Sequence, residues 1–249
     1  MKKRSKKLLF SIITVSLNQP KIIHNFKSLS NQTYKNFEHI IIDGGSTDET
    51  INIIKKNSKK ISFWQSKKDR GIYDAMNIGI KKSKGQIIGI LNADDIYYKN
   101  ALKIVKKYFE NKSIDFLFGT VKKDRILQGF WPEKINWKFN IYPSHSGGFF
   151  ITRKAQKKVG NYSLKFRYSS DRDFIYRMIV KYKLNGVCTK RNEILSKFDT
   201  QGISSKVGFF ERLFEESKIR LHNNQNIFFV FFLMIAHTTN KFFNLFLKK

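Results

Sequence analysis

Asp94 and Asp95 are adjacent carboxylates that directly follow the apolar segment QIIGIL, residues 86–91. Two neighbouring carboxylates repel each other, and a bound cation would offset that repulsion. In proteins, Mg²⁺ and Mn²⁺ are typically held by one or two carboxylates together with the phosphates of a substrate. We therefore predict a divalent metal ion, Mn²⁺ or Mg²⁺, at Asp94 and Asp95. The alternative is that one of the two caps the helix that follows.

Two other groups of polar residues also follow apolar segments. One extends from Thr14 to Asn18 and the other from Asp43 to Ser46. In an open parallel sheet, the ligand binds beyond the carboxyl ends of the strands. An aspartate that follows a strand is an ordinary turn residue when it stands alone. Three such polar strand ends within the first 95 residues, however, predict a shared ligand site.

The elements that would position these residues alternate between short apolar runs and helix-period segments up to about Ile126. This alternation is typical of βαβ units and predicts an α/β fold with a mainly parallel sheet. Ser46 followed by Glu49 predicts a capping box at the start of a helix. Strands are expected at residues 10–15, 38–43, 61–65, 86–91, 115–121 and 187–198, and helices at residues 71–82, 100–109, 170–181 and 209–222.

Composition narrows the possible functions. The chain has 249 residues and a net charge of +29, from 48 Lys and Arg against 19 Asp and Glu. The single cysteine, Cys188, excludes a disulfide framework, and the absence of GxxxxGKT/S and GxGxxG motifs disfavours a P-loop kinase or a dinucleotide oxidoreductase. The lysines are scattered and no nucleic-acid-binding motif accompanies them. We interpret them as solvated side chains, and attraction to an anionic membrane surface is an alternative.

The C-terminal segment has the longest apolar run. Residues 227–236, IFFVFFLMIA, are apolar without interruption, and the polar residues 237–241 separate them from FFNLFL. Crossing a bilayer takes about 20 predominantly apolar residues, so the run is too short to span alone. We predict a helix lying in the membrane interface, and the alternative is a helix packed on the core. The N-terminal MKKRSKKLLFSIITVSL lacks the cleavage site of a secretion signal, so we expect a cytoplasmic protein.

Four ordered motifs, SIITVSLN, HIIIDGGSTDET, DRGIYDAMNIGI and GILNADD, resemble those of an inverting family-2 glycosyltransferase. The resemblance covers roughly residues 8–205. It implies a GT-A fold, which is a Rossmann-like mixed, mainly parallel sheet flanked by helices. Residues 1–205 would form this domain, with a nucleotide-binding half at about 8–126 and an acceptor half at about 127–205. Residues 206–249 would form a helical, apolar, membrane-associating tail.

The same resemblance implies a nucleotide-sugar donor at the strand ends. Thr14 and Asp43 would contact the base, and Asn18 would lie nearby. Residues 92–95 would take the place of the family's Asp-x-Asp motif, with Asp94 and Asp95 serving the ribose and the metal bound to the diphosphate. Asn92 stands where the first aspartate of that motif is usual, so which carboxylate binds the metal stays open. Met76 stands where many relatives have arginine, so a basic contact to the donor is absent or comes from Arg70. The implied substrate-binding residues are Thr14, Asn18, Asp43, Ser46, Arg70, Asp74, Asn77, Asn92, Ala93, Asp94 and His145.

The general base is the remaining role. Inverting transfer needs a carboxylate that takes the proton of the acceptor hydroxyl. Similar segments in the family place a catalytic aspartate at the start of a helix, and Asp171 matches that position. Asp173 is the second candidate, and the alternative is that both are first-turn residues favoured by the helix dipole. His145 is expected in the substrate site rather than in proton transfer.

The sequence thus indicates a metal-assisted glycosyltransferase, of hexosyl or N-acetylhexosaminyl groups, that uses a nucleotide sugar, with UDP as the expected nucleotide. The expected acceptor is a glycan or a lipid-linked saccharide of a bacterial surface polysaccharide, such as lipopolysaccharide or capsule. The enzyme would lie at the inner face of the cell membrane. Two alternatives stay open: a non-catalytic basic module that binds nucleic acid or a membrane surface, and a nucleotidyltransferase that uses Asp94 and Asp95 for its metals.

Overall fold

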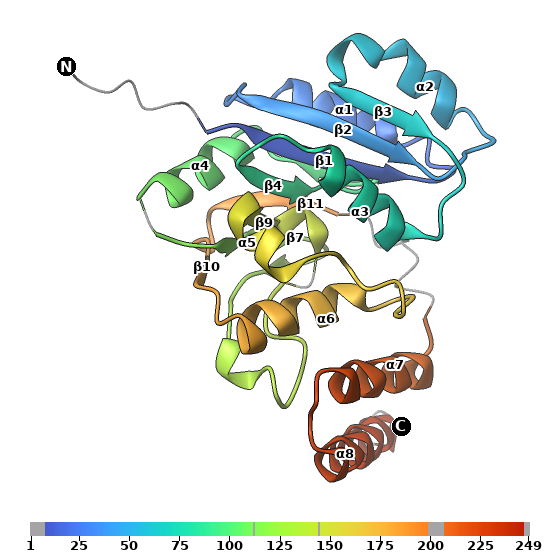
Figure 1. The fold of residues 1–249 in the computed structure, drawn as a ribbon, viewed down its shortest axis with the longest axis vertical. Helices are drawn as coiled ribbons and strands as arrows, with labels where there is room; N and C mark the ends of the chain where they lie inside the picture. The colour runs from blue at the N-terminus through green and yellow to red at the C-terminus, as the bar shows by residue number, and fades with distance from the viewer. Residues whose placement is uncertain (1–7, 112, 144, 199–206, 247–249) are drawn as a thin grey trace.

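The fold is built on a seven-stranded sheet with the strand order β10-β6-β9-β4-β1-β2-β3 (Figure 1). The computed structural model describes residues 8–111, 113–143, 145–198 and 207–246. Strand β9 is antiparallel to both of its neighbours, and the other pairs of the sheet are parallel. The predicted α/β class is therefore confirmed. The strands are β1 (Phe10–Ser16), β2 (Phe37–Asp43), β3 (Phe63–Ser66), β4 (Ile87–Ile90), β6 (Phe116–Phe118), β9 (Phe149–Thr152) and β10 (Gly186–Cys188).

A second sheet of four short strands has the order β5-β11-β7-β8. We expected one continuous strand at residues 115–121 and another at residues 187–198. This prediction is wrong in one respect, because each of these segments is divided between the two sheets. Gly119 makes one division possible, since a Cβ there would collide with the side chain of Leu195. The strands of the second sheet are β5 (Ile96–Tyr97), β7 (Thr120–Lys122), β8 (Ile126–Leu127) and β11 (Ile194–Lys197).

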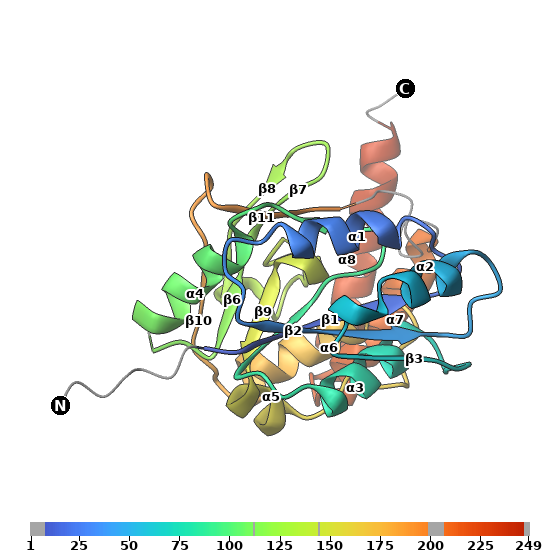
Figure 2. The same ribbon diagram turned by 90° about the horizontal axis from the view of Figure 1, so that it is seen from above.

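Helices cover both faces of the large sheet (Figure 2). Alternate residues of β1 supply the two faces: Ile13 and Val15 pack with α3, α5 and α6, whereas Phe10 and Ile12 pack with α1 and α4. This period of two is the expected pattern for a strand buried on both sides. The helices are α1 (Ile22–Ser30), α2 (Thr50–Lys56), α3 (Ile72–Lys82), α4 (Ala101–Asn111), α5 (Arg153–Val159), α6 (Ser170–Tyr176), α7 (Phe209–His222) and α8 (Ile227–Phe246).

Short turns complete the described chain. A π-helical segment, Arg177–Lys181, continues α6, and the three 3₁₀ turns are Ser58–Lys60, Pro132–Lys134 and Ser146–Gly148. The predicted domain boundary at residue 205 lies outside the described residues. Helices α7 and α8 lie together at one end of the molecule, next to α6 (Figure 1).

The capping box predicted at Ser46 and Glu49 is wrong. Helix α2 begins at Thr50, and the carboxylate of Asp48, rather than the hydroxyl of Ser46, accepts from the N–H of Thr50, at 3.0 Å. The hydroxyl of Ser46 instead donates a hydrogen bond to the carboxylate of Asp43, at 2.5 Å. A buried carboxylate is energetically costly unless it is hydrogen-bonded. Asp43 is buried, so its carboxylate binds the hydroxyl of Ser46 that the sequence spacing had assigned to the start of the helix.

The C-terminal apolar segment forms one continuous helix. Residues 237–241, which interrupt the apolar run, are helical like their neighbours. Thr238 is accommodated because its hydroxyl donates to the carbonyl of Met234, one turn earlier, at 2.8 Å. None of the helices that the structure describes is both long and apolar enough to cross a membrane.

Candidate active site

The polar strand ends predicted from the sequence meet at one edge of the large sheet. Strand β1 lies between β2 and β4 and is parallel to both, so the carboxyl ends of the three strands point the same way. The chain moves from β1 outward to β2 and β3 and then returns to β4 on the other side of β1. Such a reversal of strand order opens a crevice at the carboxyl ends, where open α/β sheets bind ligands.

Asp43 organises the loop after β2. Its side chain is fully buried, and its Oδ2 accepts hydrogen bonds from the backbone N–H groups of both Gly45 and Ser46, at 3.0 and 2.8 Å. The hydroxyls of Ser46 and Ser66 also donate to it, at 2.5 and 2.7 Å. Asp43 therefore holds the loop in one conformation and links it to the end of β3.

Asn18 joins the loop after β1 to the loop after β2. Its side-chain oxygen accepts from the N–H of Thr47, at 2.9 Å, and its own N–H donates to Ser46, at 2.7 Å. Asn18 has a φ of 48°, in the left-handed region that asparagine tolerates better than most residues. The exposed side of Asn18 and the half-buried Ser46 thus form one rim.

Thr14 lies deeper than the rim. It is fully buried, and its hydroxyl is 2.9 Å from Nε2 of His39 and 3.4 Å from Oδ1 of Asn25. Burial lowers the pKa of His39 to about 3, so its ring is neutral at physiological pH. Asn25 also donates to the carbonyl of Asn92, at 2.9 Å. This buried network connects β1 and the first half of β2 to the loop after β4.

The loop after β4 contains the predicted metal residues. Ala93 is buried, and its N–H donates to the carbonyl of Val15, which fixes the loop beside β1. Asp95 is only 1% exposed, whereas Asp94 is partly exposed. Oδ2 of Asp95 is 3.5 Å from Nε2 of His145. The predicted substrate-site residue His145 is therefore brought next to Asp95 from a segment about 50 residues away.

His145 contacts Asp95 as a neutral ring. Burial lowers the pKa of His145 to about 3. Its Nδ1 accepts from the N–H of Gly147, at 3.2 Å, so the proton of the neutral ring is assigned to Nε2, which faces Asp95. Phe198 stacks on the ring with centroids 3.9 Å apart. His145 thus orients the carboxylate of Asp95 without neutralising its charge.

A divalent cation fits the carboxylates of this loop. Among the described residues, no cluster of three or more His, Cys, Asp and Glu side chains could hold a metal ion by itself. Asp94 and Asp95 supply hard oxygen donors, and the remaining positions would come from water and from the phosphates of a substrate. This is the usual way in which Mg²⁺ and related ions bind in phosphate sites.

The segment before α3 adds a carboxylate that the sequence pattern did not reveal. Asp69 lies against Gly44, since a Cβ at Gly44 would be 2.9 Å from its Oδ2. Burial raises the pKa of Asp69, and the nearby charges of Asp74 and Asp43 contribute in the same direction. The signal that could have identified Asp69 is a fourth strand end, since it follows β3 by three residues.

Arg70 and Asp74, which were both predicted to bind the nucleotide-sugar donor, bind each other. The side chain of Arg70 is 74% exposed and binds the carboxylate of Asp74, at 3.2 Å. The guanidinium of Arg70 is the main reason why the pKa of Asp74 is lowered. Asn77 is further along α3, where it exchanges two hydrogen bonds of 2.9 Å with the backbone of Tyr162. Its amide therefore fastens α3 to the acceptor half.

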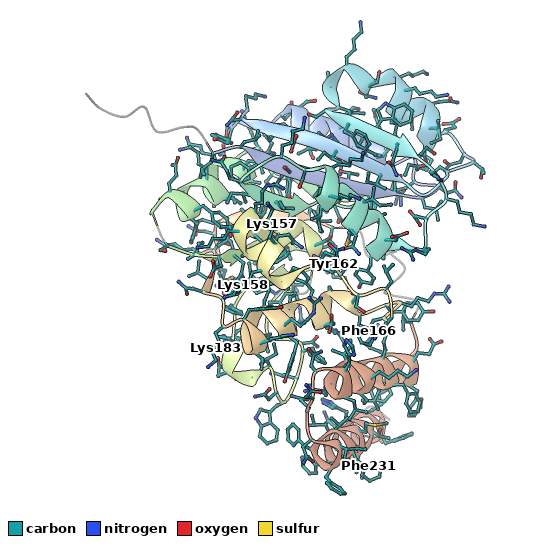
Figure 3. The ribbon with its side chains drawn as sticks, in the orientation of Figure 1. Lys157, Lys158, Tyr162, Phe166, Lys183 and Phe231 are labelled. Carbon is teal, nitrogen blue, oxygen red and sulfur yellow. The ribbon has the colours of Figure 1, made fainter. Side chains whose placement is uncertain are left out.

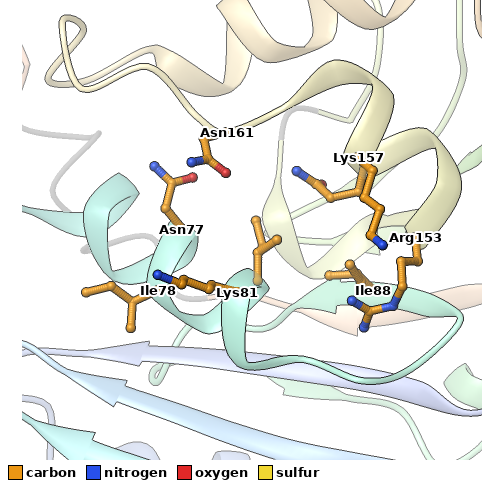
Figure 4. A pocket seen from close by; sticks show the side chains of 9 residues that line it. Asn77, Ile78, Lys81, Ile88, Arg153, Lys157 and Asn161 are labelled. Atoms are coloured by element: carbon orange, nitrogen blue, oxygen red, sulfur yellow. The ribbon is translucent and has the colours of Figure 1, made fainter.

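A cavity of about 370 Å³ lies beside Asn77, between α3 and α5 (Figure 4). Ile78, Ile80 and Ile88 contribute its apolar walls, while Lys81 and Lys157 contribute positive charge. Asn77 is the single member of the predicted site that lines it. This cavity does not coincide with the strand-end rim.

Asp171, the predicted general base, lies in the first turn of α6 between two tyrosines. The hydroxyls of Tyr73 and Tyr142 donate to its two oxygens, at 3.1 and 3.3 Å. Tyr73 also donates to the carbonyl of Tyr168, at 3.1 Å. Burial raises the pKa of Tyr73 and of Tyr142 well above the usual value, and the charge of Asp171 adds to this. Both phenols therefore stay protonated and donate to the carboxylate.

Asp173, the second candidate for the base, has a different environment. It is 1% exposed, and its oxygens bind Arg177 and Asn223, each at 2.9 Å. A carboxylate that is buried in an ion pair has little access to a substrate hydroxyl. Asp173 therefore fastens α6 to the end of α7, and Asp171 is the more accessible of the two.

Helix α7 holds the segment that leads to Asp171. Glu215 accepts hydrogen bonds from the N–H groups of Arg167 and Tyr168, at 2.6 and 3.0 Å. In addition, Arg172 forms an ion pair with Glu216. The sequence pattern assigned no role to these α7 carboxylates, because nothing in the local spacing links them to a segment about 48 residues earlier.

Helix α3 connects the strand-end rim to Asp171. The segment before it lies against the loop after β2, and Tyr73 in its first turn binds Asp171. Tyr142 and His145 make a second connection, since Tyr142 binds Asp171 and His145 faces Asp95. The predicted carboxylates thus lie along one continuous chain of contacts rather than on separate surfaces.

Sequence comparisons identify similar proteins. Residues 11–175 match the family described as Glycosyl transferase family 2. The chain is 31% identical over 211 residues to an uncharacterized glycosyltransferase of Mycobacterium tuberculosis, covering 78% of this chain and 76% of that protein. It is 32% identical over 179 residues to a PGL/p-HBAD biosynthesis glycosyltransferase of Mycobacterium bovis, covering 68% and 69%.

One similar relative is much longer than this chain. An uncharacterized glycosyltransferase of Rickettsia bellii is 37% identical over 127 residues, which is 49% of this chain but only 18% of that protein. The match to the Rickettsia protein thus covers less than a fifth of that protein, whereas the match to the Mycobacterium tuberculosis protein covers about three quarters of it.

Solved structures share the fold. Staphylococcus aureus TarS 1–349 in complex with UDP-GlcNAc has a TM-score of 0.66 at 16% identity, covering 90% of this chain and 70% of that one. The mannosyltransferase PcManGT of Pyrobaculum calidifontis, in complex with GDP-Man and Mn²⁺, has a TM-score of 0.64 at 14% identity, covering 86% and 62%. The predicted GT-A fold is therefore confirmed.

Proposed function

The chain belongs to glycosyl transferase family 2, and from this membership we propose that it transfers a sugar from a nucleotide-sugar donor to an acceptor hydroxyl, with inversion at the anomeric carbon. The structural neighbours TarS and PcManGT are complexes with UDP-GlcNAc and GDP-Man, and this supports a nucleotide sugar as donor. We propose UDP as the nucleotide. Family membership favours this function over a non-catalytic basic module and over a nucleotidyltransferase.

The strand-end rim is the proposed donor site. Asn18 and Ser46 would face the nucleoside, and Asp43 and Thr14 would hold that rim from below, since both are fully buried. A fixed rim loses little conformational freedom when a ligand binds. Arg70 is highly exposed beside Asp74 and supplies a cation toward the phosphates.

Asp94 and Asp95 are the proposed metal residues. A divalent ion such as Mn²⁺, when bound there, would neutralise charge on the departing diphosphate. The protein's own contribution is the orientation of the carboxylates: Asp95 is held by burial and by His145, and the loop is held by the buried Ala93 and the partly buried Asn92. The Mn²⁺ in the PcManGT complex supports this choice.

Asp171 is the proposed general base. Its carboxylate would take the proton of the acceptor hydroxyl while that oxygen forms a bond to the anomeric carbon. The bond between the anomeric carbon and the diphosphate oxygen would break on the opposite side, and the nucleoside diphosphate would leave. No covalent enzyme intermediate is needed in this single displacement.

One observation carries the assignment of the base: Asp171 accepts hydrogen bonds from two buried phenols, one on α3 and one on the segment before His145. These hydrogen bonds hold the carboxylate of Asp171 in one orientation. They also fix the carboxylate against the two segments that lead to the donor edge. Asp173 lacks this access because Arg177 and Asn223 occupy its oxygens.

The acceptor is proposed to be a glycan or a lipid-linked saccharide in the synthesis of a bacterial surface polysaccharide. The exposed apolar side of α8 supports peripheral contact of the enzyme with the inner face of the cell membrane. The name of the Mycobacterium bovis relative, which refers to PGL/p-HBAD biosynthesis, is compatible with a lipid-associated acceptor. Residues 206–249 would form the membrane-associating part.

Replacing Asp171 by Asn tests the proposed base. We expect transfer to fall by about 10²- to 10⁴-fold, the range that a positioned acid or base supplies, while UDP still binds. Release of UDP from UDP-sugars in the presence of acceptor extracts measures turnover, and calorimetry measures UDP binding. The matched control is Asp124→Asn, at an exposed position outside the site. Turnover of Asp171→Asn at the rate of the control would remove Asp171 from the mechanism.

A further inference from the structure

The outward side of α8 is an apolar surface that no other described part of the chain covers. Phe228 is 81% exposed, and Phe231, labelled in Figure 3 at the end of the molecule, is 62% exposed. We call this surface the α8 apolar face. Its members are Ile227, Phe228, Phe231, Phe232, Ile235, Phe242 and Phe243.

These side chains form one stripe along the helix. At 100° per residue they occupy an arc of about 160°, and Thr238 and Thr239 are the polar residues that fall within it. Helix α8 contains no Asp or Glu, and its single Lys or Arg among residues 227–246 is Lys241. Val230 and Leu233 lie on the opposite side and are buried. A stripe of this kind matches a flat apolar boundary rather than a small pocket.

The border of the stripe has the side chains that suit a lipid headgroup region. Trp137, which is 57% exposed, packs edge-on against Phe229 of α8 with ring centroids 5.1 Å apart. Lys134 and Lys138 are exposed in the same turn as Trp137. Tryptophan is enriched at membrane interfaces, and lysine binds anionic headgroups there.

We propose that the α8 apolar face, with Trp137, Lys134 and Lys138 at its border, inserts into the headgroup region of an anionic bilayer, with α8 parallel to the membrane. The net charge of the chain favours an anionic membrane over a second copy of the chain as the partner of this surface. The chain carries a net charge of +29, so a second copy is repelled, whereas an anionic lipid surface is attracted. The inference rests on the membrane contact of the proposed function, and it adds the docking surface and the class of lipid.

The same docking orients the candidate active site. Helix α8 packs on α7, and α7 holds the segment before Asp171 through Glu215. The acceptor half therefore lies closer to the α8 apolar face than strands β2 and β3 do (Figure 1). An acceptor anchored in the bilayer would reach Asp171 from this side.

Vesicle sedimentation with the full chain tests the proposal without using sugar transfer. Wild type is expected to bind vesicles of phosphatidylglycerol and phosphatidylcholine and to bind pure phosphatidylcholine at least about tenfold more weakly. The double variant Phe231→Gln/Phe232→Gln is expected to lose at least about tenfold in affinity for the anionic vesicles. The control, Leu164→Gln, changes an exposed apolar residue elsewhere and is expected to bind as wild type does.

Each outcome of the vesicle experiment either supports or overturns the proposed membrane contact. Circular dichroism checks that the variants are folded, which is expected because the substituted side chains are exposed. Unchanged vesicle binding by Phe231→Gln/Phe232→Gln would overturn the proposal. So would a wild-type dimer in analytical ultracentrifugation that this variant converts to a monomer, since the face would then bind a second copy. Because no step of the assay needs a donor sugar, a failure here is separate from a failure of the glycosyltransferase assignment.

Discussion

The candidate active site has two regions that are built in different ways. One is the proposed donor edge, formed by the rim of Asn18 and Ser46 with Asp43 and by the loop of Asp94 and Asp95, and the other is the proposed acceptor side around Asp171. At the proposed donor edge, most of the contacts join loops that follow neighbouring parallel strands: Asp43 binds Gly45, Ser46 and Ser66, and Asn18 binds Thr47. On the proposed acceptor side, Asp171 is held by Tyr73 and Tyr142, which are 98 and 29 positions away. The first region is organised by adjacent strands of one sheet, whereas the second needs helices α3, α6 and α7 to pack together.

This difference has a functional consequence. An edge organised by the loops of adjacent strands can bind a nucleotide with little dependence on α6 and α7. A base held by distant segments is correctly placed only when α3, α6 and α7 are all docked. We therefore expect damage to the donor edge to weaken donor binding, and damage to α7 to slow turnover while leaving donor binding intact.

The largest expected effect in this comparison is that of Asp95→Asn. The substitution removes one negative charge from the proposed metal loop, so the affinity for Mn²⁺ and the UDP binding that depends on it should fall by about 10²-fold. Calorimetry of UDP with and without Mn²⁺ measures this loss. Asparagine has the same shape as aspartate and keeps the contact with His145, so the fold should be retained. If Asp95→Asn bound UDP and Mn²⁺ as tightly as Asp124→Asn does, the metal would have to be assigned elsewhere.

A smaller effect is expected from Glu215→Ala in α7. Its carboxylate accepts from two backbone N–H groups just before Asp171, so its loss should displace the base and lower kcat by about tenfold. Donor KM and UDP affinity should not change. Glu215→Gln keeps one oxygen acceptor and should restore part of kcat. Lys218→Ala, at an exposed position of the same helix, is the matched control.

The kinetic split distinguishes a positioning role from general destabilisation. If Glu215→Ala raised the donor KM as much as it lowered kcat, the acceptor side would not be energetically separate from the donor edge. The two regions would then have to be treated as one cooperative unit. Equal kcat values for Glu215→Ala and Lys218→Ala would show that α7 has no influence on the base.

The same contrast explains what the sequence could predict. The strand ends at Asp43 and at Asn92–Asp95 were predictable because apolar runs mark the strands and parallel strands end at one edge. Asp171 was identified through the family resemblance and stays a prediction as a base. Its tyrosine partners and Glu215 were not predictable, since no local spacing records which residues meet after packing. Ser46 was misassigned to a helix cap because the spacing did not show that buried Asp43 would take its hydroxyl.

The last expected effect concerns stability rather than activity, and it arises in the buried network of Thr14, Asn25 and His39. His39 is neutral in the folded protein because burial lowers its pKa to about 3, whereas in the unfolded chain it takes up a proton near pH 6.5. The unfolded state therefore binds more protons as the pH falls below about 6.5, and the free energy of unfolding decreases down to about pH 3. Between pH 7 and pH 5, His39 alone should account for about 2 kcal/mol of this decrease.

Urea unfolding of His39→Gln at both pH values measures that contribution. The variant should be less stable than wild type at pH 7, because the contact with Thr14 is altered, but its stability should decline less on acidification. The difference between the two declines, rather than either stability alone, is the quantity to compare. His145→Gln provides a parallel case on the loop beside Asp95, where burial also lowers the histidine pKa to about 3. Identical declines for wild type and His39→Gln would mean that His39 takes up a proton in the folded state as readily as in the unfolded chain. The network of Thr14, Asn25 and His39 would then be open to water rather than dry.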